Sequence, residues 1–426
     1  KYENRTVYRN TKIKRLRRET PTFKIDIYLE EKMKVTVEDI SNFPEFADLK
    51  LIAGRGGLNK AVEKCGILDY EFVEGVREKW YNTNFRDENM IVMTSFLYAK
   101  DNEYLIMDAV KNLTSRKCSG LIIKNIFHLP IHENVIRYAD TMNFPILVIE
   151  GSNIHFEDLI VLISERIRHY ELLHYRESKV DEILRSGSDY RLLESISYDI
   201  NPTFKTDMVA MFFKAKGQFG PREYLKMEKL IEDSALMTAS DSMFYYRDGF
   251  FIIHSREMFT CVDAEKLAKP FIEMFGEAAG GFRVGISAVH HLLWQIKNCF
   301  EESKYAASLD SGEASGYVLY ENLGIYKVIL PYCTDSVMKE FCRDYIKPLE
   351  DYDLETKGNL LETAINYVLN GADIQKTAQA MLQHKNTIRY RLKNISNIIG
   401  MNVFETKNYE ILSFAVRIFI CNDESI

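Results

Sequence analysis

The residues best suited to binding chemistry lie between positions 384 and 393 of the 426-residue chain. They supply hydrogen-bond donors and cations with no acidic residue among them: His384, Lys385, Asn386, Thr387, Arg389, Tyr390, Arg391 and Lys393. Lysine and arginine neutralise DNA phosphates, while asparagine, threonine and arginine reach base edges in the major groove. This composition predicts an interface for double-stranded DNA.

Two short helices are expected to position these side chains. In a helix predicted over 386–399, apolar residues recur every three or four positions: Ile388, Leu392, Ile395 and Ile399. A helix over 374–382 precedes it, and the short turn 383–385 between them is typical of a helix-turn-helix. Asn386 and Thr387 are expected to cap the second helix. The alternative is a helix pair that only packs within an all-α domain.

A second set of candidates follows predicted strand ends in the first 150 residues. The apolar runs 120–123 and 145–149 predict strands that are buried on both faces of a parallel sheet. Helices between them complete an α/β domain over residues 33–152. Because such sheets bind ligands at their strand ends, we expect a small-molecule effector to contact four polar residues there: Arg55, Thr94, Ser95 and Lys124.

A long helix without glycine or proline is predicted over residues 153–186, inside a helical linker that spans 153–203. Five of its residues step by three and four, as in the seam of a coiled coil: Ile160, Ile163, Ile167, Tyr170 and His174. This stripe has two explanations, a dimerising helix or a helix that lies on one domain's own core. The sequence leaves both open.

Residues 204–322 alternate strands and helices in the order βαββαβαβ, which predicts an α+β domain. Segment 243–253 is expected to form a β-hairpin with Asp248 and Gly249 at its tip, because a type I′ turn favours residues that tolerate positive φ. From residue 323 to 426 the pattern is entirely helical. The expected fold class is therefore multidomain, from α/β through α+β to an all-α DNA-binding domain.

The C-terminal segment also resembles the helix-turn-helix of PucR/CdaR-type bacterial transcription regulators. In that family a segment close to H-x-N-T-x-x-Y-R-L opens the recognition helix. The resemblance rests on residues 359–373, Thr377-Ala378, His384 to Lys393, Ile399-Gly400 and 412–416. It implies that residues 323–426 form the DNA-binding domain.

Residues 33–167 are similar to the N-terminal domain of the same family, through segments 35–40, 51–58 and 93–95. In the family this domain is regarded as the sensory part, and several relatives control purine or amino-acid catabolism. The resemblance implies a regulator whose effector biases the spacing of two reading heads over operator half-sites. A homodimer is the expected assembly.

The middle domain is similar in element order to a GGDEF-type cyclase fold. An active cyclase needs a Gly-Gly-Asp/Glu-Glu-Phe hairpin, because its acids hold metal beside the nucleotide. The hairpin here reads Arg247-Asp-Gly-Phe-Phe251, with phenylalanine in place of the second acid. We expect a scaffold without catalytic residues. A nucleotide-processing enzyme or a nucleotide-binding signalling protein is the alternative.

Composition limits other classes of function. Seven scattered cysteines without a C-x-x-C spacing indicate neither a disulfide framework nor a thiolate metal site, so we expect no metal and no cofactor. The apolar runs are far shorter than the ~20 residues that cross a bilayer. The sequence therefore predicts a cytoplasmic protein with no membrane partner.

The net charge of −7 is unevenly distributed. Residues 1–32 hold ten Lys or Arg and five Asp or Glu without regular periodicity, and are expected to be a basic tail. Residues 373–400 hold five Lys or Arg and one Asp. Removing these charges of +5 and +4 from the total leaves −16 for the rest of the chain. An acidic body with one basic helix pair favours DNA binding at that pair.

Overall fold

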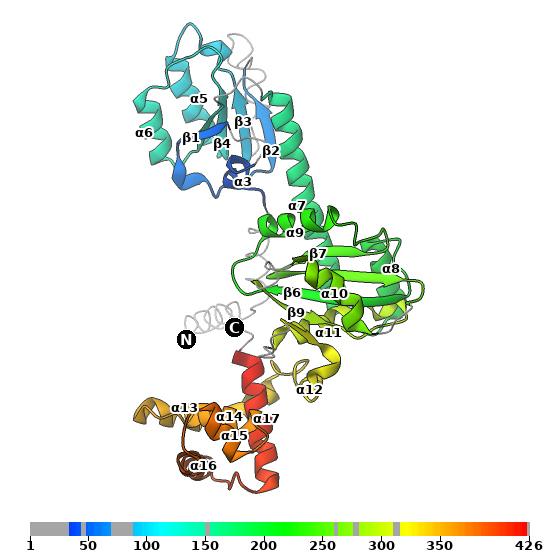
Figure 1. Ribbon diagram of the computed structural model, residues 1–426. Helices are drawn as coiled ribbons and strands as arrows, with labels where there is room; N and C mark the ends of the chain where they lie inside the picture. The colour runs from blue at the N-terminus through cyan, green and yellow to red at the C-terminus, as the bar shows by residue number, and fades with distance from the viewer. Residues whose placement is uncertain are drawn as a thin grey trace, which may run out of the picture. The chain divides into compact units, whose positions relative to one another are not determined.

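The computed structural model of the chain (Figure 1) describes residues 34–43, 48–69, 88–149, 154–259, 263–275, 281–309 and 316–423. The predicted tail 1–32 lies outside the described residues. Contacts divide the chain into two compact units. The N-terminal unit contains the described residues up to Ser178 together with Phe219–Leu225, and the C-terminal unit contains Lys179–Gln218 and the described residues from Lys226 onward.

The N-terminal unit is built on a five-stranded sheet in the order β1-β5-β4-β3-β2. Its strands are β1 (Leu49–Ala53), β2 (Lys64–Ile67), β3 (Met90–Thr94), β4 (Gly120–Lys124) and β5 (Ile146–Ile149). Strands β2 to β5 are parallel, whereas β1 runs antiparallel to β5. The predicted α/β character of this region is confirmed.

Helices cover both faces of this sheet, as the continuous apolar strands require. One face packs against α5 (Tyr104–Ser115) and α6 (Glu133–Thr141). The other packs against α3 (Val37–Ser41) and the first half of α7 (Phe156–Arg185). Figure 1 shows α5 and α6 together on one side of the sheet and α7 on the other. The short helices η2 (Arg55–Gly57) and η4 (Leu97–Ala99) follow β1 and β3.

The stripe along α7 lies on the core of the N-terminal unit. Ile163 and Tyr170 are buried in that core, and Ile160 and Ile167 pack at its margin. The stripe therefore packs on one domain's own core, as the second explanation expects. A dimerising role of the helix stays a prediction. His174, the last residue of the stripe, is exposed.

The middle of the chain forms a second five-stranded sheet in the order β10-β9-β6-β8-β7. Its elements follow the predicted order βαββαβαβ: β6 (Asp207–Ala215), α9 (Pro221–Glu232), β7 (Ser242–Tyr246), β8 (Gly249–Arg256), α10 (Ala264–Phe275), β9 (Phe282–Ile286), α11 (Ile296–Ser308) and β10 (Tyr317–Leu319). Helix α8 (Tyr190–Ile200) and α11 share a core with one face of the sheet. Assignment to a GGDEF-type fold, and the predicted domain boundaries, stay predictions.

The hairpin between β7 and β8 turns one residue earlier than predicted. Tyr246 pairs with Gly249, so the two-residue turn consists of Arg247 and Asp248 rather than Asp248 and Gly249. Arg247 has φ +50°, the left-handed conformation that the turn requires. Gly249 instead allows a close approach within the sheet, because a Cβ there would lie 2.1 Å from the Phe213 carbonyl oxygen.

The remaining chain is helical, as predicted. It contains η7 (Tyr320–Leu323), α12 (Tyr326–Ile329), α13 (Ser336–Thr356), α14 (Leu360–Leu369), α15 (Ile374–Ala380), α16 (Lys385–Ile399) and α17 (Thr406–Asp423). Buried residues from α13, α14, α16 and α17 form one apolar core. No helix in the described part of the chain is both long and apolar enough to span a bilayer.

Candidate nucleic-acid interface and ligand sites

The α15–turn–α16 segment has the geometry of a helix-turn-helix. Asp373 caps α15 by accepting hydrogen bonds from the backbone N–H of Gln375 at 2.7 Å and of Lys376 at 3.1 Å. These hydrogen bonds lower the pKa of Asp373, because they stabilise its carboxylate. The chain leaves α15 after Ala380 and enters α16 at Lys385.

The turn closes α15 with a Schellman motif. The N–H of Gln383 donates to the carbonyl of Ala378 at 2.9 Å, and the N–H of Leu382 donates to that of Gln379 at 3.1 Å. Leu382 has φ +52°, at the position where this motif usually holds glycine. Its side chain is 91% exposed, so no packing accounts for the strained backbone. The helical period of the sequence did not reveal this residue.

His384, rather than Asn386 or Thr387, caps α16. The backbone of His384 is extended, with φ −76° and ψ 144°, and its Nδ1 accepts a hydrogen bond from the N–H of Asn386 at 3.2 Å. The predicted caps were wrong because Lys385 is already helical, which places Asn386 and Thr387 inside the first turn. Thr387 is half-buried there.

One side of α16 lies in the core, as its apolar period predicts. Ile388, Leu392 and Ile395 have no exposed surface and belong to the core of the C-terminal helices. Burying three such side chains stabilises the helix by about 1.5–3 kcal/mol each relative to exposure. The core therefore fixes which side of α16 meets solvent.

The opposite side of α16 presents the basic face, which we define by five exposed residues: Lys385, Asn386, Arg389, Tyr390 and Lys393. Tyr390 is 65% exposed. Within the described part of the chain, Lys385, Arg389 and Lys393 form no ion pair. Three unpaired cations and an amide on one helix surface can meet phosphates and base edges together.

Arg391 differs from the basic face. It is half-buried, and its Nη1 donates to the Thr363 hydroxyl of α14 at 3.3 Å. Thr363 is fully buried and donates in turn to the carbonyl of Asn359. Arg391 therefore links α16 to α14, which helical spacing alone did not predict.

The residues predicted to hold an effector do not lie at one edge of the N-terminal sheet. Thr94 and Lys124 end the neighbouring parallel strands β3 and β4. Arg55 follows β1, whose end pairs with Ile146 at the start of β5. The grouping of Arg55 with the others was wrong, because β1 runs antiparallel and ends at the opposite edge.

The other three predicted residues have partners within the unit. The Thr94 hydroxyl donates to the carbonyl of Leu68 at 2.6 Å, and the N–H and hydroxyl of Ser95 donate to Asp69 at 2.9 and 3.0 Å. The Lys124 ammonium donates to the carbonyl of Ile154 at 2.6 Å. These contacts fix the loops after β3 and β4, so an effector at this edge would compete with them.

A cavity of about 340 Å³ lies elsewhere in the N-terminal unit. Its lining comes from three segments far apart in sequence: Lys34, Val35, Val62, Glu63, Ile167, Tyr170, Glu171 and His174. Apart from the stripe on α7, no sequence pattern predicts this site, because the other segments meet only in the fold. In the described residues, no group of three or more His, Cys, Asp or Glu side chains could hold a metal ion.

The middle domain buries both phenylalanines of the β7–β8 hairpin. Phe250 has no exposed surface and stacks on Phe213, with ring centroids 4.7 Å apart. Phe251 is equally buried on the other face, 4.7 Å from the ring of Phe300. Both positions are occupied by core side chains.

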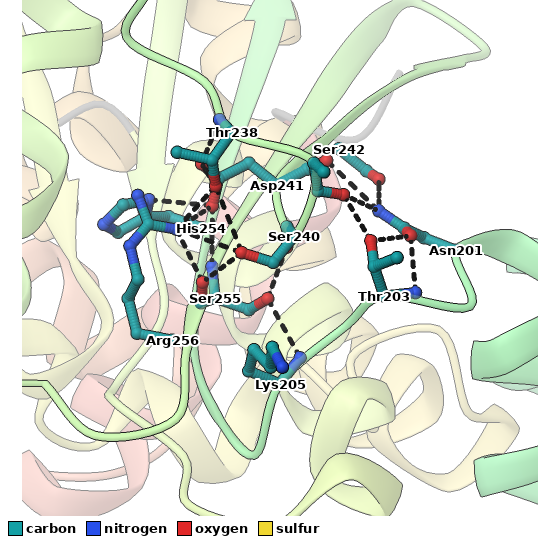
Figure 2. A network of polar contacts seen from close by, with 11 residues as sticks. Asn201, Thr203, Lys205, Thr238, Ser240, Asp241, Ser242, His254, Ser255 and Arg256 are labelled. Atoms are coloured by element: carbon teal, nitrogen blue, oxygen red, sulfur yellow. Dashed lines mark hydrogen bonds and ion pairs between the residues drawn. The ribbon is translucent and has the colours of Figure 1, made fainter.

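Figure 2 shows a polar network around Asp241 in the same domain. The buried Asp241 carboxylate lies 3.0 Å from Nδ1 of His254 and accepts from Nη1 of Arg256 at 2.7 Å. The N–H groups of Thr238 and Ser255 donate to it at 2.8 and 3.0 Å. Burial raises the pKa of Asp241, but these hydrogen bonds outweigh burial and hold the pKa at about 2.

An N-terminal and a C-terminal part of the chain each match a known protein family. Residues 39–167 match the purine catabolism regulatory protein-like family, PucR, and residues 360–418 match the PucR C-terminal helix-turn-helix domain. The chain carries two PucR-type domains. The PucR-type helix-turn-helix domain contains α15, α16 and the basic face.

Two known proteins are similar to parts of this chain. The purine catabolism regulatory protein of Bacillus subtilis (strain 168) is 23% identical over 192 residues, which cover 43% of this chain and 34% of that protein. The match thus spans about a third of the length of that relative. A solved regulator of polyketide synthase expression from Bifidobacterium adolescentis has 16% identity and a TM-score of 0.24, over 57% of this chain and 98% of that one.

Proposed function

We propose that this protein is a ligand-responsive, DNA-binding transcriptional regulator. The observation that carries the proposal is the basic face of α16, three unpaired cations exposed on the second helix of a PucR-type helix-turn-helix. The affinity of a protein for DNA depends largely on contacts with phosphates, and its sequence specificity depends on contacts with base edges. The basic face offers side chains for both kinds of contact.

Each residue of the segment has a proposed role. Lys385 and Lys393 position the helix on phosphates, and Arg389 contacts guanine or phosphate. Asn386 contacts a base edge. Thr387 and Tyr390 contact the DNA backbone beside that base. His384 orients the first turn as its cap, and Arg391 holds the helix against α14 while its remaining N–H groups serve phosphate.

The proposal extends to the whole protein in three respects. We infer a homodimer, because paired half-sites require two reading helices. The N-terminal domain senses a small-molecule effector. The regulated genes belong to a catabolic pathway of the purine or amino-acid type, as the name of the Bacillus subtilis relative suggests, and the protein works in the cytoplasm where bacterial DNA lies.

The decisive test is to sequence the genomic fragments that the purified protein retains at moderate salt. We expect a recurring motif with two half-sites about one helical turn apart. Affinity for that motif should fall steeply as salt rises, because each phosphate contact releases a counterion. Retention without any recurring motif would contradict sequence-specific regulation.

Arg389→Ala provides the matching residue-level test. Losing one phosphate contact should reduce the salt slope by about one, and losing a guanine contact should cost about 1–3 kcal/mol at one base pair. Lys339→Ala is the control, because Lys339 is exposed on α13 beside the end of α17 and outside the basic face. Equal DNA affinity of the Arg389 variant and the wild type would remove Arg389 from the interface.

We also propose that the middle domain is a scaffold and no cyclase. The supporting observation is that Phe250, which stands where the motif has its second acid, is a buried core side chain stacked on Phe213. Incubation of the protein with GTP and Mg²⁺ should yield no cyclic dinucleotide by chromatography. Any metal-dependent product would overturn the scaffold role.

A further inference from the structure

The cavity in the N-terminal unit has an apolar floor. Val35 and Val62 are 2% and 1% exposed, and Ile167 and the Tyr170 ring join them from α7. A volume of about 340 Å³ lies at the lower end of the range for small-molecule sites. The floor suits the apolar body of a small organic molecule.

Tyr170 places an unused polar group in this floor. Its side chain is 4% exposed, and its hydroxyl hydrogen-bonds to none of the residues that the structure describes. Burial raises the pKa of Tyr170 above its ordinary range, so the group is a neutral phenol. The hydroxyl is not one of the fully buried polar atoms that lack a partner among the described residues. It belongs to a residue that lines the cavity, so a polar atom of a bound molecule can hydrogen-bond to it.

The rim of the cavity carries an unbalanced negative charge. Lys34 and Glu63 pair with each other at 2.8 Å, and this hydrogen bond lowers the pKa of Glu63. Glu171 and His174 lie three residues apart on α7, and Glu171 forms no ion pair with any described residue. The Lys34–Glu63 pair balances its own charge, so the carboxylate of Glu171 is left without an ion-pair partner among the described residues of the rim.

The charged side chains around Tyr170 do not change the net negative charge of the rim. Arg222 donates to Asp39 at 2.7 Å, and Glu223 accepts from the N–H of Gly220 at 3.0 Å. Arg166 lies over the ring of Phe43, 4.8 Å from its centroid. The cation of Arg166 and the carboxylate of Glu223 offset each other, so the rim determines which charge is favoured.

We propose that this cavity binds a small organic amine with an apolar body. The body packs on Val35, Val62 and Ile167, and the ammonium group lies at Glu171. The Tyr170 hydroxyl forms a hydrogen bond with the ligand. The proposal deepens the proposed function, because this ligand would be the effector, but binding at the cavity does not depend on DNA.

Three probes of one shape and different charge test the proposal on the full chain by isothermal titration calorimetry: phenethylamine, 2-phenylethanol and phenylacetate. We expect phenethylamine to bind about tenfold more tightly than the alcohol, the effect of one charge-assisted contact, and phenylacetate to bind most weakly. Failure of all three to bind, or tighter binding of phenylacetate, would overturn the proposal.

Variants assign the binding to this cavity. Glu171→Gln should reduce phenethylamine affinity about tenfold and leave 2-phenylethanol affinity unchanged, whereas Glu165→Gln, an exposed carboxylate on the same helix, should change neither. Tyr170→Phe should weaken both probes several-fold. Circular dichroism melts confirm that each variant is folded. An unchanged phenethylamine affinity in folded Glu171→Gln would refute the site.

DNA retention is measured in parallel on the same preparations. Amine binding without DNA retention would refute the regulator and leave the cavity site standing. DNA retention without amine binding would refute the cavity site and leave the regulator standing.

Discussion

Arg391 is one of the residues proposed to bind DNA, and it also contacts the neighbouring helix α14. Arg389 and Lys393 face solvent, whereas Arg391 also donates to the buried hydroxyl of Thr363 at 3.3 Å. Because of this contact, replacing Arg391 should affect the stability of the helix pair as well as the proposed DNA binding.

Arg391→Ala should lower the local free energy of unfolding of α14 and α16 by about 1 kcal/mol, because a hydrogen bond between helices is lost. Native-state hydrogen exchange should show this as several-fold faster exchange in both helices. Arg389→Ala is the matched control and should leave these rates unchanged. Unaltered exchange in the Arg391 variant would mean that the contact adds no stability.

Asp241 should make the stability of the middle domain depend on pH. Its pKa is held at about 2 in the folded protein, below its ordinary value of 3.8. A depressed carboxyl pKa contributes stability that is fully present above the ordinary value and is lost as pH falls toward 2. The contribution amounts to about 2 kcal/mol.

Acid titration of the Trp80→Phe protein, followed by fluorescence of Trp294, which is partly buried against the core that α8 and α11 share, measures this loss. Asp241→Asn should lower stability at neutral pH and flatten its change between about pH 4 and pH 2. The exposed Asp233→Asn should keep the slope of the parent protein. A slope that persists in the Asp241 variant would assign the acid sensitivity to other groups.

The turn between α15 and α16 is an element with a local strain that one substitution should relieve. Leu382→Gly should stabilise the helix pair by about 1 kcal/mol, because glycine accepts φ +52° without a Cβ penalty and Leu382 is exposed. Leu382→Ala keeps the Cβ and should bring no such gain. Slower amide exchange in α15 and α16 of the glycine variant measures the effect.

Elements with strong periodicity were predictable from sequence. The strands β4 and β5 and the buried stripe of α16 agree with their apolar runs to within a residue or two. Helix caps and turns were less predictable, since Lys385 is helical and the hairpin turns at Arg247. These features depend on where single backbone angles change, which side-chain type specifies weakly.

The two candidate sites also differ in how far they could be predicted from sequence. The residues of the basic face lie on one helix, so their spacing in the sequence predicts that they share a surface. The cavity combines residues near positions 34, 62 and 170, which only the fold brings together. Arg55 was misplaced for a related reason, because no local pattern states that β1 runs antiparallel.

At the scale of the whole molecule, α7 belongs to both units. Ile163 and Tyr170 lie in the core of the N-terminal unit. Further along the helix, Asp181 accepts hydrogen bonds from the Tyr246 hydroxyl at 2.7 Å and from Arg247 at 3.2 Å. The first part of α7 therefore lines the cavity of the N-terminal unit, and its last residues contact the hairpin within the C-terminal unit.

The segment Phe219–Leu225 belongs to the N-terminal unit, and Arg222 should hold it there. Arg222→Gln removes an ion pair with Asp39 that is partly exposed, so we expect a cost of about 0.5–1 kcal/mol. Hydrogen exchange across residues 219–225 should accelerate a few-fold. Lys226→Gln, exposed on the same helix, should leave it unchanged.

The placement of Phe219–Leu225 also constrains how such a chain can be recombined. Seven residues of the N-terminal unit are encoded inside the stretch that encodes the middle domain. A single genetic crossover after Ser178 would leave them behind, and a transplanted N-terminal unit would lack the Arg222 partner of its own Asp39. Successful chimaeras of this architecture should carry residues 219–225 from the same parent as the rest of their N-terminal unit, so inheritance of the two stretches should be coupled.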